Sequence, residues 1–114
     1  MSSIKLKRIN AELVRCISEV LMLESRDPLM KSITITYADV ASDLSIAKIY
    51  FTSLEDKSHE SLEKEMEEAS DFIRKKIADI IRIRTIPKLV FKYDESIEYG
   101  NKIEKIIKEL HEKE

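Results

Sequence analysis

The segment Ser70–Asp94 reads SDFIRKKIADIIRIRTIPKLVFKYD and joins the end of a long helical pattern to a strand. It carries seven lysines and arginines, whereas the preceding segment Glu55–Asp71 holds eight acidic residues against two lysines. The formal net charge of the whole chain is only −2 at pH 7, so the basic segment stands apart. A protein with charges sorted in this way can present one basic surface to a polyanion. The charge pattern therefore indicates a nucleic-acid partner before it indicates catalysis.

A long helix is predicted from Ser58, a suitable N-cap, to about Arg84. Its apolar residues recur at helical spacing and form one stripe: Leu62, Met66, Ala69, Ile73, Ile77 and Ile80. On a straight helix Arg84 would fall on this apolar stripe. We therefore predict a kink or a break between roughly Lys75 and Ile83, near Ala78.

Three strands and two further helices complete the pattern. The predicted strands are Ser32–Ala38, Leu44–Ser53 and Lys88–Asp94. The predicted helices are Ile4 to about Glu24, with Ser3 as its N-cap, and a final helix within Ser96–Glu112. Regular alternation in the first strand places Ile33, Ile35 and Tyr37 on one face.

The order of these elements predicts one α+β domain over residues 1–114. The order is α-β-β-α-kink-α-β-α, with the helices packed on one face of a three-stranded sheet. The short link at Ala41–Asp43 favours an antiparallel pair of strands. A right-handed crossover through the long helix would then make the second and third strands parallel.

The sequence offers little that resembles a catalytic or metal site. His59 and His111 are far apart, so we expect solvated histidines and no metal. Cys16 lies at the edge of an apolar stripe and is expected to be a small buried hydrophobe. Gly100 is the only glycine, which excludes a glycine-rich phosphate loop. We expect neither enzymatic activity nor a cofactor.

Composition also indicates the compartment. A single cysteine favours a reducing environment. The first twenty residues interleave charged and apolar side chains, unlike a signal peptide, and no apolar run is long enough to span a bilayer. We expect a cytoplasmic, monomeric protein without a membrane partner.

The basic residues of the long helix have two interpretations. Arg74, Lys75 and Arg82 share one predicted solvent-facing sector, with Lys76 at its margin, and could neutralise phosphates. Alternatively, such residues form ion pairs along the helix, of which Lys75–Asp71 and Lys75–Asp79 are examples. Composition alone leaves both open. The exposed sheet face offers one aromatic residue, Tyr50, which is weak support for base stacking.

Several segments together resemble the ribosome-binding factor A family of bacteria and organelles. The similar segments are KLKRINAELVRCISEVL, RDPLM, ITITYADVASDLSIAKIYFT, IRKKIADIIRIRTIPKLVFKYDES and EYGNKIEKIIKEL. The most specific positions are Ser42-Asp43-Leu44, Ala47–Tyr50, Arg82-Ile83-Arg84, Pro87, Leu89, Phe91 and Asp94. These matches follow the same order over nearly the whole chain.

The resemblance implies a KH-like domain of the second topological type. The family replaces the GxxG loop of other KH domains with a helix-kink-helix, and an alanine usually stands at the kink, here Ala78. It implies a non-catalytic factor that binds the free small ribosomal subunit, contacts ribosomal RNA, assists late subunit maturation and supports growth in the cold. Small-subunit ribosomal proteins are further candidate partners. The family often has a basic residue where Leu29 stands.

On this interpretation the kinked helix and the start of the next strand dock on RNA phosphates. The candidate contacts are Arg74, Lys75, Lys76, Arg82, Arg84 and Lys88, with Arg8 and Arg15 as secondary ones. Two alternatives remain. One is a general KH-like RNA-binding protein unrelated to ribosomes. The other is a protein-interaction module that docks through the acidic segment Glu55–Asp71.

Overall fold

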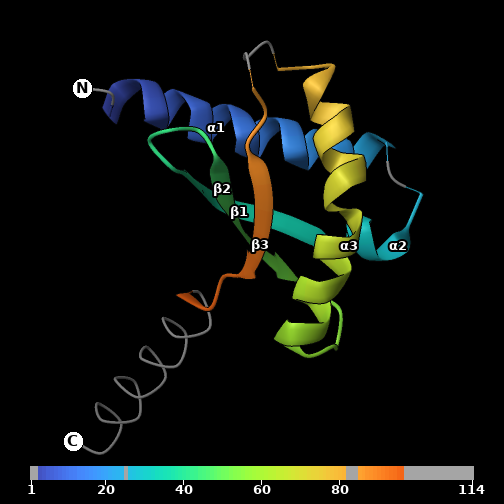
Figure 1. Ribbon diagram of the computed structural model, residues 1–114. Helices are drawn as coiled ribbons and strands as arrows, with labels where there is room; N and C mark the ends of the chain where they lie inside the picture. Colours follow the sequence, from blue (N-terminus) through green and yellow to red (C-terminus); the bar gives the residue numbers. More distant parts are fainter. Residues whose placement is uncertain (1–2, 25, 82–84, 97–114) are drawn as a thin grey trace, which may run out of the picture.

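The computed structural model describes residues 3–24, 26–81 and 85–96, which form the expected α+β arrangement (Figure 1). The elements in chain order are α1 (Ser3–Glu19), a π-helical turn η1 (Val20–Glu24), α2 (Pro28–Lys31), β1 (Ile33–Val40), β2 (Ile46–Ser53), α3 (His59–Ala78) and β3 (Lys88–Tyr93). The helix predicted within Ser96–Glu112 lies outside the described residues, apart from Ser96 itself.

The three strands form one sheet in the order β1-β2-β3. Strands β1 and β2 are antiparallel, and β2 and β3 are parallel, so both predicted pairings are confirmed. The tight link between β1 and β2 contains Leu44 at φ 62°, in the left-handed region. Asp43 Oδ1 accepts hydrogen bonds from the Ser45 backbone N–H at 3.0 Å and from its hydroxyl at 2.6 Å, and these bonds stabilise the turn. Strand β2 consequently begins at Ile46, later than predicted.

A β-bulge in β1 overturns the predicted alternation. The register shifts between Ile35 and Tyr37, so the residues beyond the bulge change faces. Tyr37 is 54% exposed, whereas Ala38 is 1% exposed and belongs to the core. The prediction that Tyr37 shares a face with Ile33 and Ile35 was therefore wrong, because an extra residue in one strand reverses the alternation that follows it.

The N-terminal helices differ from the prediction in two details. Ser3 is the first residue of α1, so it does not have the N-cap position predicted for it. The short helix α2 was not predicted from the sequence. Asp27 is its N-cap and accepts a hydrogen bond from the Leu29 backbone N–H at 2.9 Å, with Pro28 in the first turn. Leu29 is buried, which explains why an apolar residue suits this position.

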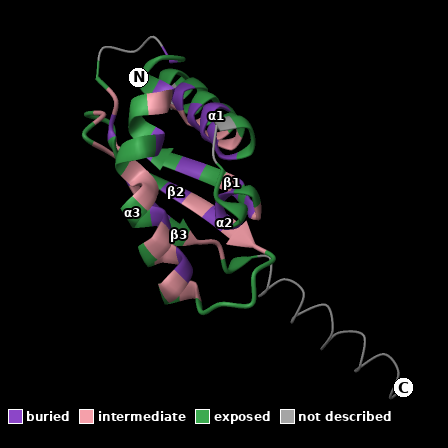
Figure 2. Cartoon of the chain, turned by 90° about the vertical axis from the view of Figure 1, so that its right-hand side faces the viewer, coloured by how far each residue is buried: buried purple, intermediate pink, exposed green. Residues whose placement is uncertain are grey.

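The core lies between the helices and one face of the sheet (Figure 2). Helix α1 packs against β1 and α3 packs against β3. The largest fully buried side chains include Leu13, Ile17, Ile49, Phe51, Leu62 and Met66. Burying a large apolar side chain stabilises the fold by roughly 1.5–3 kcal/mol, so this one-sided layer holds the domain together. The opposite face of the sheet is left without a helix among the described elements.

Helix α3 ends where a break was predicted. Its last residue is Ala78, and Asp79 is its C-cap. The chain leaves the helix at this point, so Ile80 is 43% exposed and Ile81 is buried in its place. The assignment of Ile80 to the apolar stripe was therefore wrong. Residues 79–81 form a turn and an irregular segment, so they do not continue as the second half of a kinked helix.

Candidate nucleic-acid interface

The C-terminal end of α3 carries the basic cluster that the sequence singled out. Arg74 and Lys75 are exposed, and both line a pocket of about 310 Å³ together with Asp71, Ala78 and Ile86. In Figure 1 this end of α3 lies beside α1. Basic side chains in the last turn also complement the partial negative charge of a helix C-terminus. The pocket therefore places two basic side chains and one carboxylate next to the apolar residues Ala78 and Ile86.

Arg74 has a structural role that the sequence did not indicate. Its Nε and Nη2 donate hydrogen bonds to the backbone carbonyl of Ile86, at 3.2 and 2.6 Å. These bonds tie the end of α3 to the segment that enters β3. A guanidinium has five N–H donors, so Arg74 keeps donors for a phosphate while it holds this segment in place.

Lys75 forms neither of the two ion pairs that were named as examples of the second interpretation. Neither Asp71 nor Asp79 lies within the 4.0 Å of an ion pair with Lys75, and in the described part of the chain no other acid does either. Lys76 is half-buried, and its Nζ lies 5.7 Å from the centre of the Phe72 ring, in a cation–π contact. The intrahelical pairs that could have neutralised Lys75 are thus not formed.

Lys88 is exposed at the start of β3, in a separate groove. This groove, about 370 Å³, runs between β3 and the acidic half of α3, and its lining includes Glu60, Glu63, Lys64 and Glu67. Lys88 therefore faces carboxylates as well as solvent, and it is not part of the pocket of Arg74 and Lys75.

Arg8 and Arg15, the two candidate phosphate contacts on α1, differ in the ion pairs that they form. Both side chains are exposed. Arg15 forms ion pairs with Glu12 at 2.8 Å and Glu19 at 3.0 Å, which compete with a phosphate. The hydrogen bond from Arg15 to Glu12 also raises the pKa of Arg15. Arg8 forms no ion pair with any described acid.

The remaining predicted site residues are Arg82, Arg84 and Ala78. Arg82 and Arg84 lie outside the described residues. Ala78 is the last residue of α3, is exposed and lines the pocket. Tyr37 is a surface residue that was not predicted from the sequence. No signal in the alternation reveals the bulge that exposes it.

Cys16 and His59 are the other side chains that could be reactive or bind a metal, and each has contacts within the fold. Cys16 is fully buried, and burial raises the pKa of its thiol, so the thiol stays protonated and inert near neutral pH. His59 is not the solvated histidine that we expected. It stacks on Tyr93 at 3.6 Å between ring centres, and its Nδ1 lies 3.1 Å from Glu95 Oε1.

The described residues contain no group of three or more metal-ligating side chains. Within the same residues, no helix is both long and apolar enough to cross a bilayer.

The topology and the basic helix end define a small KH-like α+β domain without a glycine loop. A family model described as ribosome-binding factor A matches residues 5–107. The chain therefore belongs to the ribosome-binding factor A family. Ribosome-binding factor A of Staphylococcus carnosus is 39% identical over the full length of both chains. That of Staphylococcus epidermidis is 40% identical over 97% of each.

Solved structures share the fold. The crystal structure of ribosome-binding factor A from Thermus thermophilus has a TM-score of 0.66 at 21% identity, covering 75% of this chain and 92% of that one. A solution structure of a putative ribosome binding factor A from Thermotoga maritima has a TM-score of 0.68 at 22% identity, covering 86% and 93%. A homology model of the Thermus protein, fitted into a cryo-EM map of a complex with the 30S subunit, has a TM-score of 0.63 at 21% identity, covering 75% and 91%.

Proposed function

We propose that this protein is a cytoplasmic, non-catalytic assembly factor that binds the free small ribosomal subunit through its ribosomal RNA. The observation that carries this proposal is the exposed basic end of α3, where Lys75 has no acidic partner among the described residues. Family membership supports the choice of the ribosome, and the Thermus relative has been fitted into a 30S complex.

The charged residues divide into three groups in this proposal. Arg74, Lys75 and Lys76 contact phosphates from the end of α3, and Arg82 and Arg84 extend the same contact along the chain. Arg8 and Lys88 contribute at the margins. Arg15 contributes least, because Glu12 and Glu19 already neutralise it. Each phosphate contact releases counterions, so affinity falls as salt rises.

Assistance of maturation follows from differential affinity. A factor that binds an immature conformation of RNA more tightly than the mature one holds that conformation while other regions fold. The factor leaves when the mature state becomes more stable than the complex. No bond is made or broken in this scheme, so it requires neither a cofactor nor a catalytic residue.

Co-sedimentation tests the proposal. The protein is centrifuged separately with free small subunits, free large subunits and joined ribosomes, with and without excess bulk RNA. We expect it to pellet with free small subunits, to pellet much less with the other two, and to resist competition by bulk RNA. Equal pelleting with all three particles would contradict the assembly function. Complete displacement by bulk RNA would favour a general RNA-binding protein.

A further inference from the structure

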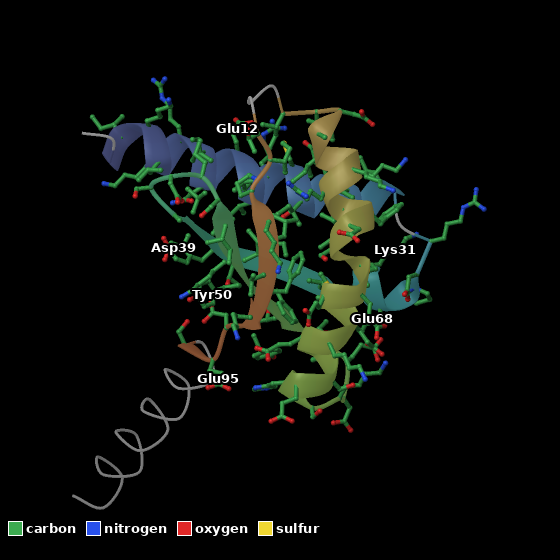
Figure 3. The ribbon with its side chains drawn as sticks, in the orientation of Figure 1. Glu12, Lys31, Asp39, Tyr50, Glu68 and Glu95 are labelled. Atoms are coloured by element: carbon green, nitrogen blue, oxygen red, sulfur yellow. The ribbon has the colours of Figure 1, made fainter. Side chains whose placement is uncertain are left out.

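The face of the sheet opposite the helices carries two tyrosines side by side. Tyr37 of β1 pairs with Tyr50 of β2 in the strand register, and their ring centres are 5.7 Å apart. Figure 3 shows Tyr50 and Asp39 on the side of the strands away from α3. The core and the helices that cover it lie on the other face, although Tyr37 also lines a hollow of about 320 Å³ with residues of α1, among them Lys7 and Asn10. The pair therefore presents an aromatic surface to solvent.

The bulge in β1 creates this surface. In the register before the bulge Ile35 pairs with Phe51, and regular continuation would place Tyr37 opposite the buried Ile49. The extra residue moves Tyr37 opposite Tyr50 instead. A β-bulge can re-aim a side chain in this way, and such bulges are frequent at sites of function. The large ring is thereby 54% exposed, although the core lies on the other face.

A hydrogen bond from Thr36 to the end of β3 fixes the bulge. Thr36 Oγ1 donates to Asp94 Oδ2 at 2.6 Å, and Asp94 Oδ1 accepts from the Ser96 backbone N–H at 2.9 Å. Hydrogen bonds from Ser96 and Thr36 hold the pKa of Asp94 below its usual range, so this carboxylate stays ionised near neutral pH. The bonds to Asp94 link the bulge of β1 to the segment after β3, on the far side of β2.

Positive charge flanks the two rings on the same face. Lys92 is the register partner of Tyr50, and Lys48 is the register partner of Val90. Both lysines are exposed, and neither forms an ion pair with a described acid. Asp39 pairs with Lys48 in the strand register, and Lys92 also lines the groove that contains Glu60 and Glu63. An exposed ring pair next to lysines can bind an unpaired nucleotide, because the base can stack on a ring and the lysines can neutralise the phosphate.

We propose that this open face binds single-stranded RNA by stacking a base on Tyr37, with Lys48 and Lys92 contacting the flanking phosphates. The inference rests on the proposed function for its choice of RNA, but it concerns a second surface. The end of α3 would hold phosphates of one RNA segment, while the sheet would hold an unpaired segment. The protein would then connect two parts of the same RNA.

Fluorescence anisotropy with the full chain tests this inference. The probes are a labelled single-stranded oligouridylate of about ten nucleotides and a labelled RNA duplex of the same length. The variants are Tyr37→Ser, which removes the ring, and Tyr37→Phe, which keeps it. Thr34→Ala is a control at another exposed position of β1. Circular dichroism and thermal unfolding check that each variant folds.

We expect Tyr37→Ser to weaken binding of the single strand by about tenfold, because the stacking of one base on an aromatic ring contributes affinity of this order. Tyr37→Phe and Thr34→Ala should bind like the wild type, and the duplex should be insensitive to all three. Unchanged single-strand binding by Tyr37→Ser would overturn the inference. So would an equal loss in Tyr37→Phe, because that result would exclude stacking as the cause.

Sedimentation with small subunits separates this inference from the proposed function. If the wild type pellets with small subunits but Tyr37→Ser binds oligouridylate as well as the wild type does, the inference about the sheet is overturned. The proposed function is then unaffected. Failure of the wild type to pellet would overturn the function, whereas the oligouridylate result would still decide the sheet inference. If Tyr37→Ser lost subunit binding but kept oligouridylate binding, the face would contact a protein, and the RNA inference would be wrong.

Discussion

The two halves of α3 use their charges differently. In the acidic half, Glu65 pairs with Lys57 at 3.1 Å, and Glu63 accepts a hydrogen bond from the Tyr93 backbone N–H at 2.9 Å. In the basic half, Lys75 has no acidic partner among the residues described. Two acids of α3 thus take part in contacts within the fold, whereas Lys75 at the basic end is left available to a partner. A run of charge in a sequence does not distinguish these two uses, but the contacts do.

Reversal of the charge at Lys75 should have the largest effect on binding. Lys75→Glu places a carboxylate where a phosphate is expected, so affinity for small subunits should fall by about tenfold or more. The fold should survive, because Lys75 is exposed. Lys64→Glu is the matched control, since Lys64 is an exposed lysine in the acidic half of the same helix. Sedimentation with small subunits measures both; equal losses would show that net charge, not location, matters.

Substitutions of Arg74 should separate the effect of its hydrogen bonds to Ile86 on stability from the effect of its charge on subunit binding. Arg74→Ala removes both hydrogen bonds to Ile86 and should lower the free energy of unfolding by about 1 kcal/mol. Arg74→Lys keeps the charge but cannot reproduce the two-pronged contact, so it should lose similar stability and retain more subunit affinity. Urea denaturation and sedimentation report the two quantities. If neither variant is destabilised, the contact with Ile86 is not an anchor.

The opposite end of α3 offers a change that should affect stability alone. Ser58 Oγ accepts a hydrogen bond from the Ser61 backbone N–H at 3.1 Å as the N-cap. Ser58→Ala should therefore cost about 1 kcal/mol in thermal or urea unfolding, with unchanged subunit affinity once the protein is folded. Weaker binding by the folded variant would show that the two ends of α3 are coupled.

Ala78 should show the smallest effect on stability. It is exposed, so Ala78→Leu should change the free energy of unfolding by no more than about 0.5 kcal/mol. The larger side chain would partly fill the pocket beside Arg74 and Lys75, and should weaken subunit binding modestly. A loss of stability well beyond this range, measured by thermal unfolding, would show that Ala78 packs closely between two elements.

Sequence reasoning recovered the topology because periodicity and loop length depend on local physics. The stripe Leu62–Ile77 and the short link before β2 were enough to predict the crossover and both strand pairings. It failed where a tertiary contact overrides a local pattern. The bulge at Thr36 is held by Asp94, which lies far away in the sequence. The role of Arg74 likewise depends on a carbonyl in the segment before β3. Neither contact leaves a periodic signal.

The salt dependence of small-subunit binding tests the central claim most directly. Affinity is measured over a series of salt concentrations for the wild type, Lys75→Ala and Lys64→Ala. If the basic end of α3 contacts phosphates, the negative slope of log affinity against log salt should become shallower by about one unit in Lys75→Ala. It should remain unchanged in Lys64→Ala. Parallel lines for all three proteins would contradict the account, because Lys75 would then contribute no phosphate contact.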